Sequence, residues 1–281
     1  MTPADGSLAR FGLAALALVP SLFIGPKIAG SSQREKALPP GLLLDGIRCG
    51  FWVFIGYMTQ SIALETTDAG KSAFICSLAV VFVPFITSIL NGLSSTVAKG
   101  PKPSWLAAGL AAVGVGFMEL GGKGSLDVQP GDWWAFAQMV GFSMGFIENE
   151  RALSRHPRHP LQMTAIQLSY VAMASVVWAF GAASLRAGGL AMPDLSAIIG
   201  DQAMLPVIGA IAFTGLVTTA FTVFIENIAL VRVSASEMAI ILSTEPLFAT
   251  VFAAFLLKET VGKEAAVGGR TDHVGLFDEP G

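Results

Sequence analysis

The chain consists mainly of long runs of apolar residues separated by short polar segments. A helix needs about 20 mostly apolar residues to cross the hydrocarbon core of a bilayer. Eight runs fit that length: 8–24, 47–65, 70–91, 104–120, 132–150, 162–184, 204–228 and 235–257. The first fits least well, because Arg10 and Pro20 lie inside it. The pattern predicts an all-α, polytopic membrane protein with eight transmembrane helices.

Composition supports the membrane interpretation. Of the 281 residues, 53% are apolar and 13% are charged, and the mean hydropathy is +0.65. Soluble domains average about 25% charged residues, so this chain has too little polar surface to remain in water. We predict an integral, multi-pass protein surrounded by a lipid bilayer. The net charge of −3 argues against a nucleic-acid partner, which would require a basic patch.

The distribution of basic residues between the loops predicts the orientation. Ten Lys and Arg residues belong to one set of loops: Lys27, Arg34, Lys36, Arg48, Lys99, Lys102, Arg151, Arg155, Arg158 and Arg232. The opposite set, with the carboxyl-terminal tail, holds seven. Because short loops rich in Lys and Arg stay in the cytoplasm, we expect the chain to start outside.

The sequence contains an internal repeat at an offset of 166 positions. Residues 62–82 and 228–248 share eight identities without a gap, among them Ile62-Ala63-Leu64 with Ile228-Ala229-Leu230. Each copy is a span, a very short loop and a second span. The charge distribution puts the first loop outside and the second inside, so the copies are inverted. Inverted repeats are typical of secondary transporters, which bind substrate near the membrane midplane between the repeats.

Four segments resemble a known family: ARFGLAALALVP at 9–20, IALETTDAGKSAFICSLAVVFVPFI at 62–86, PGDWWAFAQMVGFSMGF at 130–146 and IALVRVSASEMAIILSTEPLFATVFAAFLLKE at 228–259. Through them the chain resembles the EamA-type branch of the drug/metabolite transporter superfamily. The resemblance implies a multi-pass carrier of small organic solutes, with two inverted halves of five helices each. We assign residues 1–122 to the first half, 130–264 to the second and 265–281 to a polar tail.

The chain departs from the family pattern at both ends. Residues 9–20 resemble the second helix of the family, and Met1 stands only a few residues upstream. A tenth helix should follow Lys258-Glu259, but the segment from Val261 to Gly281 is too polar to span. We expect a truncated gene model or splice variant that lacks the first and last helices. The alternative is a genuine eight-helix variant.

The last predicted span carries one polar stripe. At 100° per residue, Ser234, Glu237, Thr244 and Glu245 fall within an arc of about 100°. Glu245 is nearly central and precedes Pro246, which leaves a backbone carbonyl without its helical partner. These residues are candidates for the substrate cavity or for coupling, with a proton as the candidate ion. The alternative for Glu245 is a protonated side chain that bonds a neighbouring helix.

Further candidates lie near the short loops of the repeat. Lys71 occupies the repeat position equivalent to Glu237, close to the opposite side of the membrane, and either serves the cavity or extends to the interface. Gln60, Glu226 and Asn227 are candidates for cavity lining or gating. We interpret the cluster at 148–151 as a solvated helix end.

Motifs for enzymatic chemistry are poorly placed. Gly141-Phe142-Ser143-Met144-Gly145 matches G-x-S-x-G but lies in a helical span rather than at a strand-to-helix turn. His156 and His159 lie among prolines that break the helix needed to align them as metal ligands. We therefore predict no catalytic residues, no metal site, no cofactor and no enzyme.

Taken together, the sequence predicts a secondary transporter of small organic metabolites that works by alternating access. A phosphorylated substrate is disfavoured because 235–257 contains no Lys or Arg. A homodimer is a candidate assembly. The alternative function is a non-transporting membrane protein, either a regulatory partner or a truncated product.

Overall fold

The computed structural model describes residues 2–24, 38–67, 69–93, 128–193 and 204–244, and these contain helices and turns without a strand. The elements in chain order are α1 (Pro3–Leu18), the 3-10 helix η1 (Val19–Phe23), α2 (Leu42–Ala63), α3 (Ala69–Ser77), α4 (Ala79–Leu93), α6 (Pro130–Arg155), α7 (Pro160–Ala187), α9 (Met204–Ala212), the π-helix η2 (Phe213–Phe221), α10 (Thr222–Leu230) and α11 (Ala235–Leu242). The all-α fold class is confirmed.

Five helical stretches in the described part of the chain are long and apolar enough to cross a membrane: Pro3–Phe23, Leu42–Ala63, Lys71–Leu90, Pro160–Ala187 and Leu205–Leu230. They coincide with five predicted spans. Large apolar side chains face outward from them, and Leu16, Val177 and Leu205 are 74%, 73% and 80% exposed. Such a surface suits contact with lipid chains rather than with water. The protein is therefore an integral, multi-pass membrane protein.

Three predicted spans remain. Helix α6 corresponds to the span at 132–150 and is long enough to cross at 26 residues. It is less apolar than the five stretches above because it packs in the interior and buries polar side chains such as Gln138 and Asn149. Residues 104–120, and 245–257 of the last span, lie outside the described residues.

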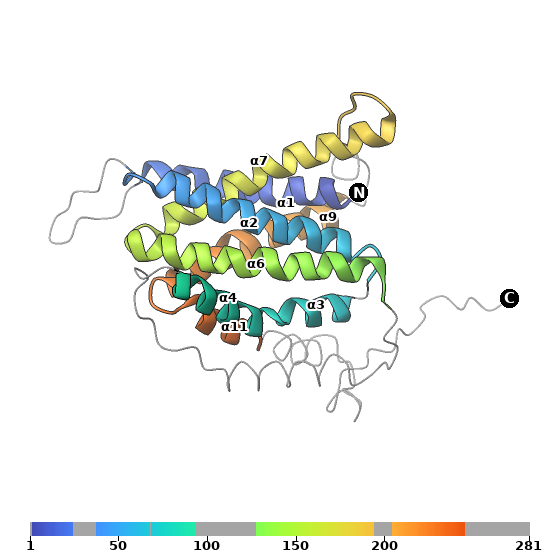
Figure 1. The fold of residues 1–281 in the computed structure, drawn as a ribbon. Helices are drawn as coiled ribbons and strands as arrows, with labels where there is room; N and C mark the ends of the chain where they lie inside the picture. Colours follow the sequence, from blue (N-terminus) through green and yellow to red (C-terminus); the bar gives the residue numbers. More distant parts are fainter. Residues whose placement is uncertain (1, 25–37, 68, 94–127, 194–203, 245–281) are drawn as a thin grey trace, which may run out of the picture.

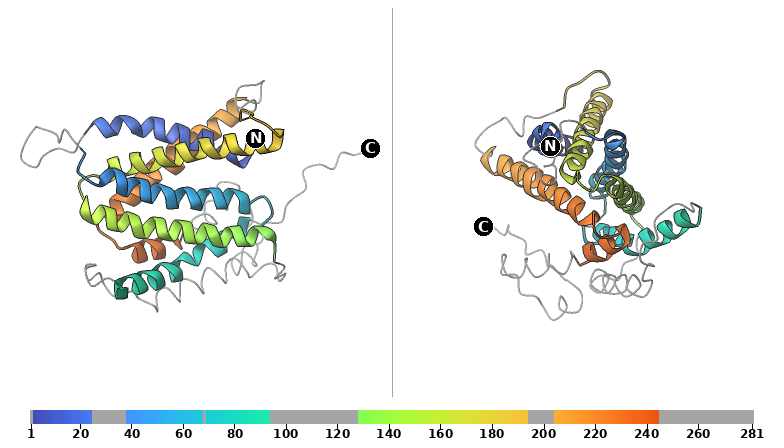
Figure 2. Two further views of the ribbon diagram at one scale, coloured as in Figure 1. Left: turned by 45° about the horizontal axis from the view of Figure 1, so that its top comes forward. Right: turned by 90° about the vertical axis from the view of Figure 1, so that its left-hand side faces the viewer.

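Helix α6 lies at the centre of the bundle (Figure 1). It packs against α2 on one side and against α3, α4 and α11 on the other. Helix α7 contacts both α1 and α2, and the views in Figure 2 show these long helices side by side. Asp45 at the start of α2 pairs with Arg155 at the end of α6, so α2 and α6 are antiparallel. Asp132 lies in the first turn of α6, and Arg155 is the last residue of that helix. We therefore call the two ends of the bundle the Asp132 end and the Arg155 end.

The helices begin and end at residues that suit those positions. Proline stands in the first turn of α1, α6 and α7, as Pro3, Pro130 and Pro160, where its missing N–H costs no hydrogen bond. The Thr2 hydroxyl accepts from a backbone N–H in the first turn of α1. Helix α7 ends at Ala187 and is followed by Gly188, whose φ of 68° favours glycine.

Helices α2 and α6 approach each other closely at a pair of glycines. A Cβ atom at Gly141 would lie 2.6 Å from the backbone nitrogen of Gly56, and one at Gly56 would lie 2.6 Å from the Phe142 ring. Further along α6, Gly145 lies against Val53. Small residues at these positions let the two backbones touch, which favours association of membrane helices.

The two copies of the internal repeat have the predicted inverted arrangement in their described parts. Helix α3 begins at Ala69 and α11 at Ala235, which are equivalent positions at the offset of 166. The turn before α3 contacts Gly131, at the start of α6. The turn before α11 lies near Glu150, close to the end of α6. The copies therefore turn at opposite ends of the bundle. Their assignment to halves 1–122 and 130–264 stays a prediction.

Candidate functional site

At the Asp132 end, α6 is joined to the first repeat turn through one carboxylate. Asp132 accepts a hydrogen bond from the Thr67 hydroxyl at 3.0 Å, pairs with the Lys71 ammonium and accepts from the backbone N–H of Gln129. Only 5% of Asp132 is exposed. Its charge lies in the first turn of α6, where the helix dipole favours an anion. We call the interactions of Asp132 with Thr67, Lys71 and Gln129 the Asp132 contact.

The Asp132 contact extends one step deeper into the bundle. The Ser72 hydroxyl of α3 donates to the Gln138 amide oxygen of α6 at 3.2 Å, and both side chains are buried. Gly131 allows the turn before α3 to approach α6, since a Cβ there would meet the Thr67 hydroxyl and would lie 2.6 Å from the Thr66 hydroxyl oxygen. The start of α3 is therefore held against α6 by polar contacts rather than by apolar packing alone.

At the Arg155 end, a second carboxylate of α6 holds the second repeat turn. Glu150 accepts a hydrogen bond from the backbone N–H of Ala235, the first residue of α11, at 2.9 Å. That N–H is one of the donors that a helix start leaves unpaired. We call this the Glu150 contact. The interpretation of residues 148–151 as a solvated helix end is wrong for Asn149, which is 4% exposed, and incomplete for Glu150.

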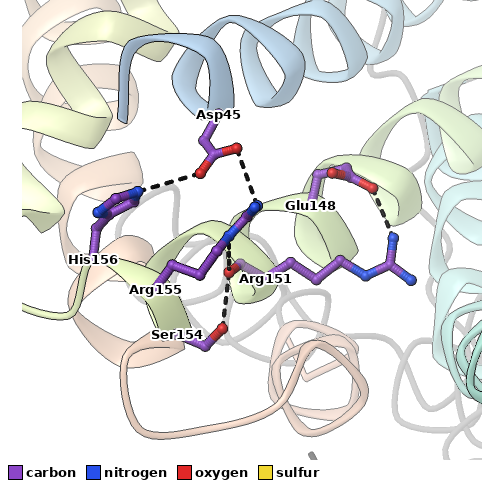
Figure 3. A network of polar contacts seen from close by, with 6 residues as sticks. All are labelled: Asp45, Glu148, Arg151, Ser154, Arg155 and His156. Atoms are coloured by element: carbon purple, nitrogen blue, oxygen red, sulfur yellow. Dashed lines mark hydrogen bonds and ion pairs between the residues drawn. The ribbon is translucent and has the colours of Figure 1, made fainter. Parts of the chain in front are cut away.

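A neighbouring network ties α6 to α2 at the same end (Figure 3). Arg155 donates to Asp45 at 3.0 Å, and His156 lies 3.4 Å from the other oxygen of Asp45. Arg151 pairs with Glu148 one turn earlier on α6. Asp45 is buried, so its charge is balanced by the basic groups at the end of α6.

The second repeat turn is also stabilised within itself. Ser234 caps α11: its hydroxyl accepts from the Glu237 N–H at 3.2 Å, and the Glu237 carboxylate accepts from the Ser234 N–H and hydroxyl. This reciprocal arrangement is a capping box. Glu237 is exposed and oriented toward the cap.

Replacing Ser234 by alanine should destabilise the second repeat turn by about 1 kcal/mol, because the N–H of Glu237 loses its acceptor. The measurement is thermal unfolding in detergent. Ser236→Ala, on the same helix but outside the cap, serves as the control. Equal melting temperatures for the two variants would contradict a stabilising role for the cap.

Near the middle of the bundle, one arginine of α1 faces polar and aromatic groups. The Arg10 Nε donates to the Thr219 hydroxyl of η2 at 2.6 Å. Its guanidinium carbon lies 5.2 Å from the Phe11 ring centre and 5.1 Å from that of Tyr57. The Tyr57 ring contacts Phe142 of α6, with ring centres 4.9 Å apart. These residues bring α1, α2, α6 and η2 together.

A second interior polar cluster lies toward the Arg155 end. Asn227 of α10 is fully buried and donates to the Thr164 hydroxyl at 2.8 Å and to the Gln167 amide oxygen at 3.3 Å. Thr164 and Gln167 both belong to α7. These two bonds pair the buried amide NH2 group of Asn227, which would be costly to leave unpaired, and they join α7 to α10.

Comparison with known proteins identifies the family. A family model described as "EamA-like transporter family" matches residues 129–271, which is half of the chain. The chain belongs to the EamA-like transporter family. Members of this family are membrane transporters rather than enzymes, which agrees with the prediction of a solute transporter in the bilayer.

Solved structures support the fold of this EamA-like transporter. Thirteen chains match it. One of them, described as "Crystal structure of protein", has a TM-score of 0.63 and 13% sequence identity, and the alignment covers 95% of this chain and 83% of that chain. At that identity the likeness shows the fold alone. No curated protein sequence matches the chain.

The structure distributes the predicted site residues of the EamA-like transporter over both ends of the bundle. Lys71 belongs to the Asp132 contact, and Asn227 to the cluster with α7. Gln60 and Glu226 are half-buried. Glu237 caps α11, and the exposed Thr244 hydroxyl donates to the carbonyl of Ile241. Glu245 and Pro246 lie outside the described residues, so the polar stripe stays a prediction.

Sequence reasoning missed three functional candidates in this transporter: Arg10, Asp132 and Glu150. In the sequence, Arg10 only makes the first predicted span less apolar. Asp132 and Glu150 stand at the limits of the predicted span 132–150, where charged residues are expected at the interface. The inverted repeat could have pointed to Asp132 and Glu150. Its two short turns are predicted on opposite sides of the membrane, and each carboxylate lies at the end of α6 on one of those sides.

Proposed function

We propose that this protein is a secondary transporter that moves small organic metabolites by alternating access. The observation that carries the proposal is the attachment of the two inverted turns to opposite ends of α6, by Asp132 and by Glu150. The two carboxylates are about 27 Å apart along the helix, at 1.5 Å per residue. That spacing is close to the thickness of the hydrocarbon core.

Such an arrangement suits a carrier because each contact closes one side of the membrane. Opening of the Asp132 contact would free the start of α3 from α6, while the Glu150 contact keeps α11 in place. Opening of the Glu150 contact, with the Asp132 contact closed, would open the other side of the membrane. Alternating access requires that the two sides do not open together, and inverted repeats provide two related packings for this purpose.

The test combines solute counterflow in proteoliposomes with thiol labelling at the two contacts. Cys49 and Cys76 are the two cysteines of the sequence and are first replaced by serine. Single cysteines are then placed at Thr67 and at Ala235, which are 5% and 0% exposed. We expect a transported solute to raise labelling by a maleimide at one position and to lower it at the other.

The labelling result separates the carrier from its alternatives. Labelling that rises or falls together at both positions would indicate a channel-like opening and would contradict alternating access. The absence of counterflow, together with labelling that no solute changes, would favour the non-transporting membrane protein. A cysteine at exposed Leu190, outside both contacts, controls for general changes in reactivity.

Two finer points of the hypothesis rest on the sequence alone. Coupling to a proton is assigned to Glu245 because a carboxylate near the bilayer centre is costly unless it is neutral, paired or hydrated. Assembly as a homodimer is the other. Both stay predictions.

A further inference from the structure

Arg10 is a charged residue inside a membrane-spanning helix. It lies seven residues after Pro3, about 10 Å from the start of α1 at 1.5 Å per residue, and it is half-buried. Ionisable groups at such positions are costly to the fold and typically mark a substrate or ion pathway. The position of Arg10 therefore calls for a compensating anion.

The described residues offer Arg10 neutral partners only. Its Nε donates to Thr219, and its guanidinium lies against the rings of Phe11 and Tyr57. None of the four ion pairs in the described part of the chain includes it. Among the same residues, no hydrogen bond engages its two terminal nitrogens. Among the described residues, no acidic side chain therefore takes the edge of the guanidinium that suits a planar carboxylate.

The π-helix η2 fixes the orientation of Arg10. The Thr219 hydroxyl donates to the carbonyl of Thr214 at 2.7 Å, so its oxygen presents a lone pair to the Arg10 Nε. Thr219 is fully buried. At Gly215, a Cβ would lie 2.9 Å from the Arg10 carbonyl oxygen, so α1 and η2 are in backbone contact. Short π-helical segments occur frequently at functional sites.

Aromatic rings extend from Arg10 toward the centre of α6. The Tyr57 ring lies 4.8 Å from the Phe11 ring and 4.9 Å from the Phe142 ring, measured between centres. Phe142 lies twelve residues into the 26-residue helix, about 18 Å from its start and near the middle of the membrane. The guanidinium and this aromatic row together offer one cationic and one apolar surface at the depth expected for a carrier site.

We propose that Arg10 binds the carboxylate of a small organic anion, whose apolar part packs on Tyr57 and Phe142. The inference rests on the proposed carrier function and names its substrate class. A guanidinium binds a carboxylate through two parallel N–H···O bonds, and it does so more strongly where water is scarce. One positive charge balances a carboxylate, whereas a phosphate monoester carries almost two negative charges.

The test measures binding with matched solutes. Purified protein in detergent is titrated with lactate and phenylpyruvate, with the corresponding amides and with inorganic phosphate, and binding is followed as the shift in melting temperature. We expect the carboxylates to stabilise the protein and the amides to have no effect. Arg10→Gln should weaken carboxylate binding about tenfold or more, as expected for the loss of charged hydrogen bonds.

Two further variants keep the result interpretable. Arg10→Lys retains the charge without the planar pair of donors and should fold normally, with carboxylate binding weakened severalfold. Arg186→Gln removes an exposed arginine at the end of α7 and should bind carboxylates as the native protein does. If Arg10→Gln does not fold, the comparison of Arg10→Lys with Arg186→Gln decides.

The outcomes distinguish this inference from the carrier function. Uptake of radiolabelled lactate, phenylpyruvate and their amides into proteoliposomes is measured in parallel. Transport of amides but not carboxylates, equal carboxylate binding by all variants, or stabilisation by phosphate alone would overturn the inference and leave the carrier intact. Arg10-dependent carboxylate binding without any transport, and with unresponsive thiol labelling, would support the binding site and overturn the carrier.

Discussion

Replacing Gly141 by leucine is expected to prevent the bundle from assembling. A Cβ at this position would lie 2.6 Å from the backbone nitrogen and 2.9 Å from the Cα of Gly56, so α2 and α6 would have to separate. Backbone atoms cannot move aside as a flexible side chain can. Overpacking costs about 3 kcal/mol when the backbone must shift, and here it affects the central helix pair.

The measurement for Gly141→Leu is the yield of monodisperse protein in detergent and its melting temperature. Gly181→Leu is the matched control, because Gly181 also lies in a long helix but has nothing within 4 Å of its Cβ position. We expect native yield for Gly181→Leu and little or no folded protein for Gly141→Leu. Native melting behaviour of Gly141→Leu would show that the glycine contact does not hold α2 against α6.

Replacing Asp132 by asparagine should weaken the Asp132 contact and increase opening at that end. Lys71 would lose the Asp132 carboxylate, with which it forms an ion pair. A hydrogen bond to a charged group contributes about 2 kcal/mol, and the Lys71 side chain is 28% exposed, so the loss should be at or below that value. The cysteine at position 67 should then react faster with maleimide.

A double-mutant cycle tests whether the pair acts as a unit. Lys71→Met removes the cation, and the double variant Lys71→Met/Asp132→Asn removes both charges. Residues in direct contact typically show an interaction free energy of about 1 kcal/mol or more, so the double variant should lose less stability than the two single variants together. Glu65→Gln, in the same turn but exposed, is the control. Additive losses would mean that the ion pair does not contribute.

The local pattern of apolar and polar residues was sufficient to predict the helices. The reason is that a transmembrane helix pairs its backbone N–H and C=O groups within one continuous segment. The spans predicted at 47–65, 162–184 and 204–228 lie within five residues of the limits of α2, α7 and the stretch Leu205–Leu230. The inverted arrangement could also be predicted from the sequence. The offset of 166 positions that aligns Ala69 with Ala235 also aligns the starts of α3 and α11. Both are properties of neighbouring residues along the chain.

The candidate site was harder to predict from the sequence, because it depends on which helices become neighbours in the fold. The sequence marked Lys71 as charged, but only the packing of α3 on α6 supplies Asp132 as its partner, 61 positions away. The same holds for Asn227, whose partners lie on α7. Arg10 was interpreted as a defect of a span, and its hydrogen bond to Thr219 crosses 209 positions.

The sequence by itself determined that this protein spans a membrane with helices, that two helix–turn–helix units repeat in inverted orientation, and to which family it belongs. The length of apolar runs, the distribution of charge between loops and the offset of the repeat are local or periodic properties of the sequence. They can therefore be determined without knowledge of the fold. The tertiary structure alone decided that α6 lies at the centre, that carboxylates at its two ends hold the two turns, and that Arg10 meets Thr219 and Tyr57. The reason is that a lone charge or amide inside a membrane is costly, and only the packing of distant segments determines which partner offsets that cost.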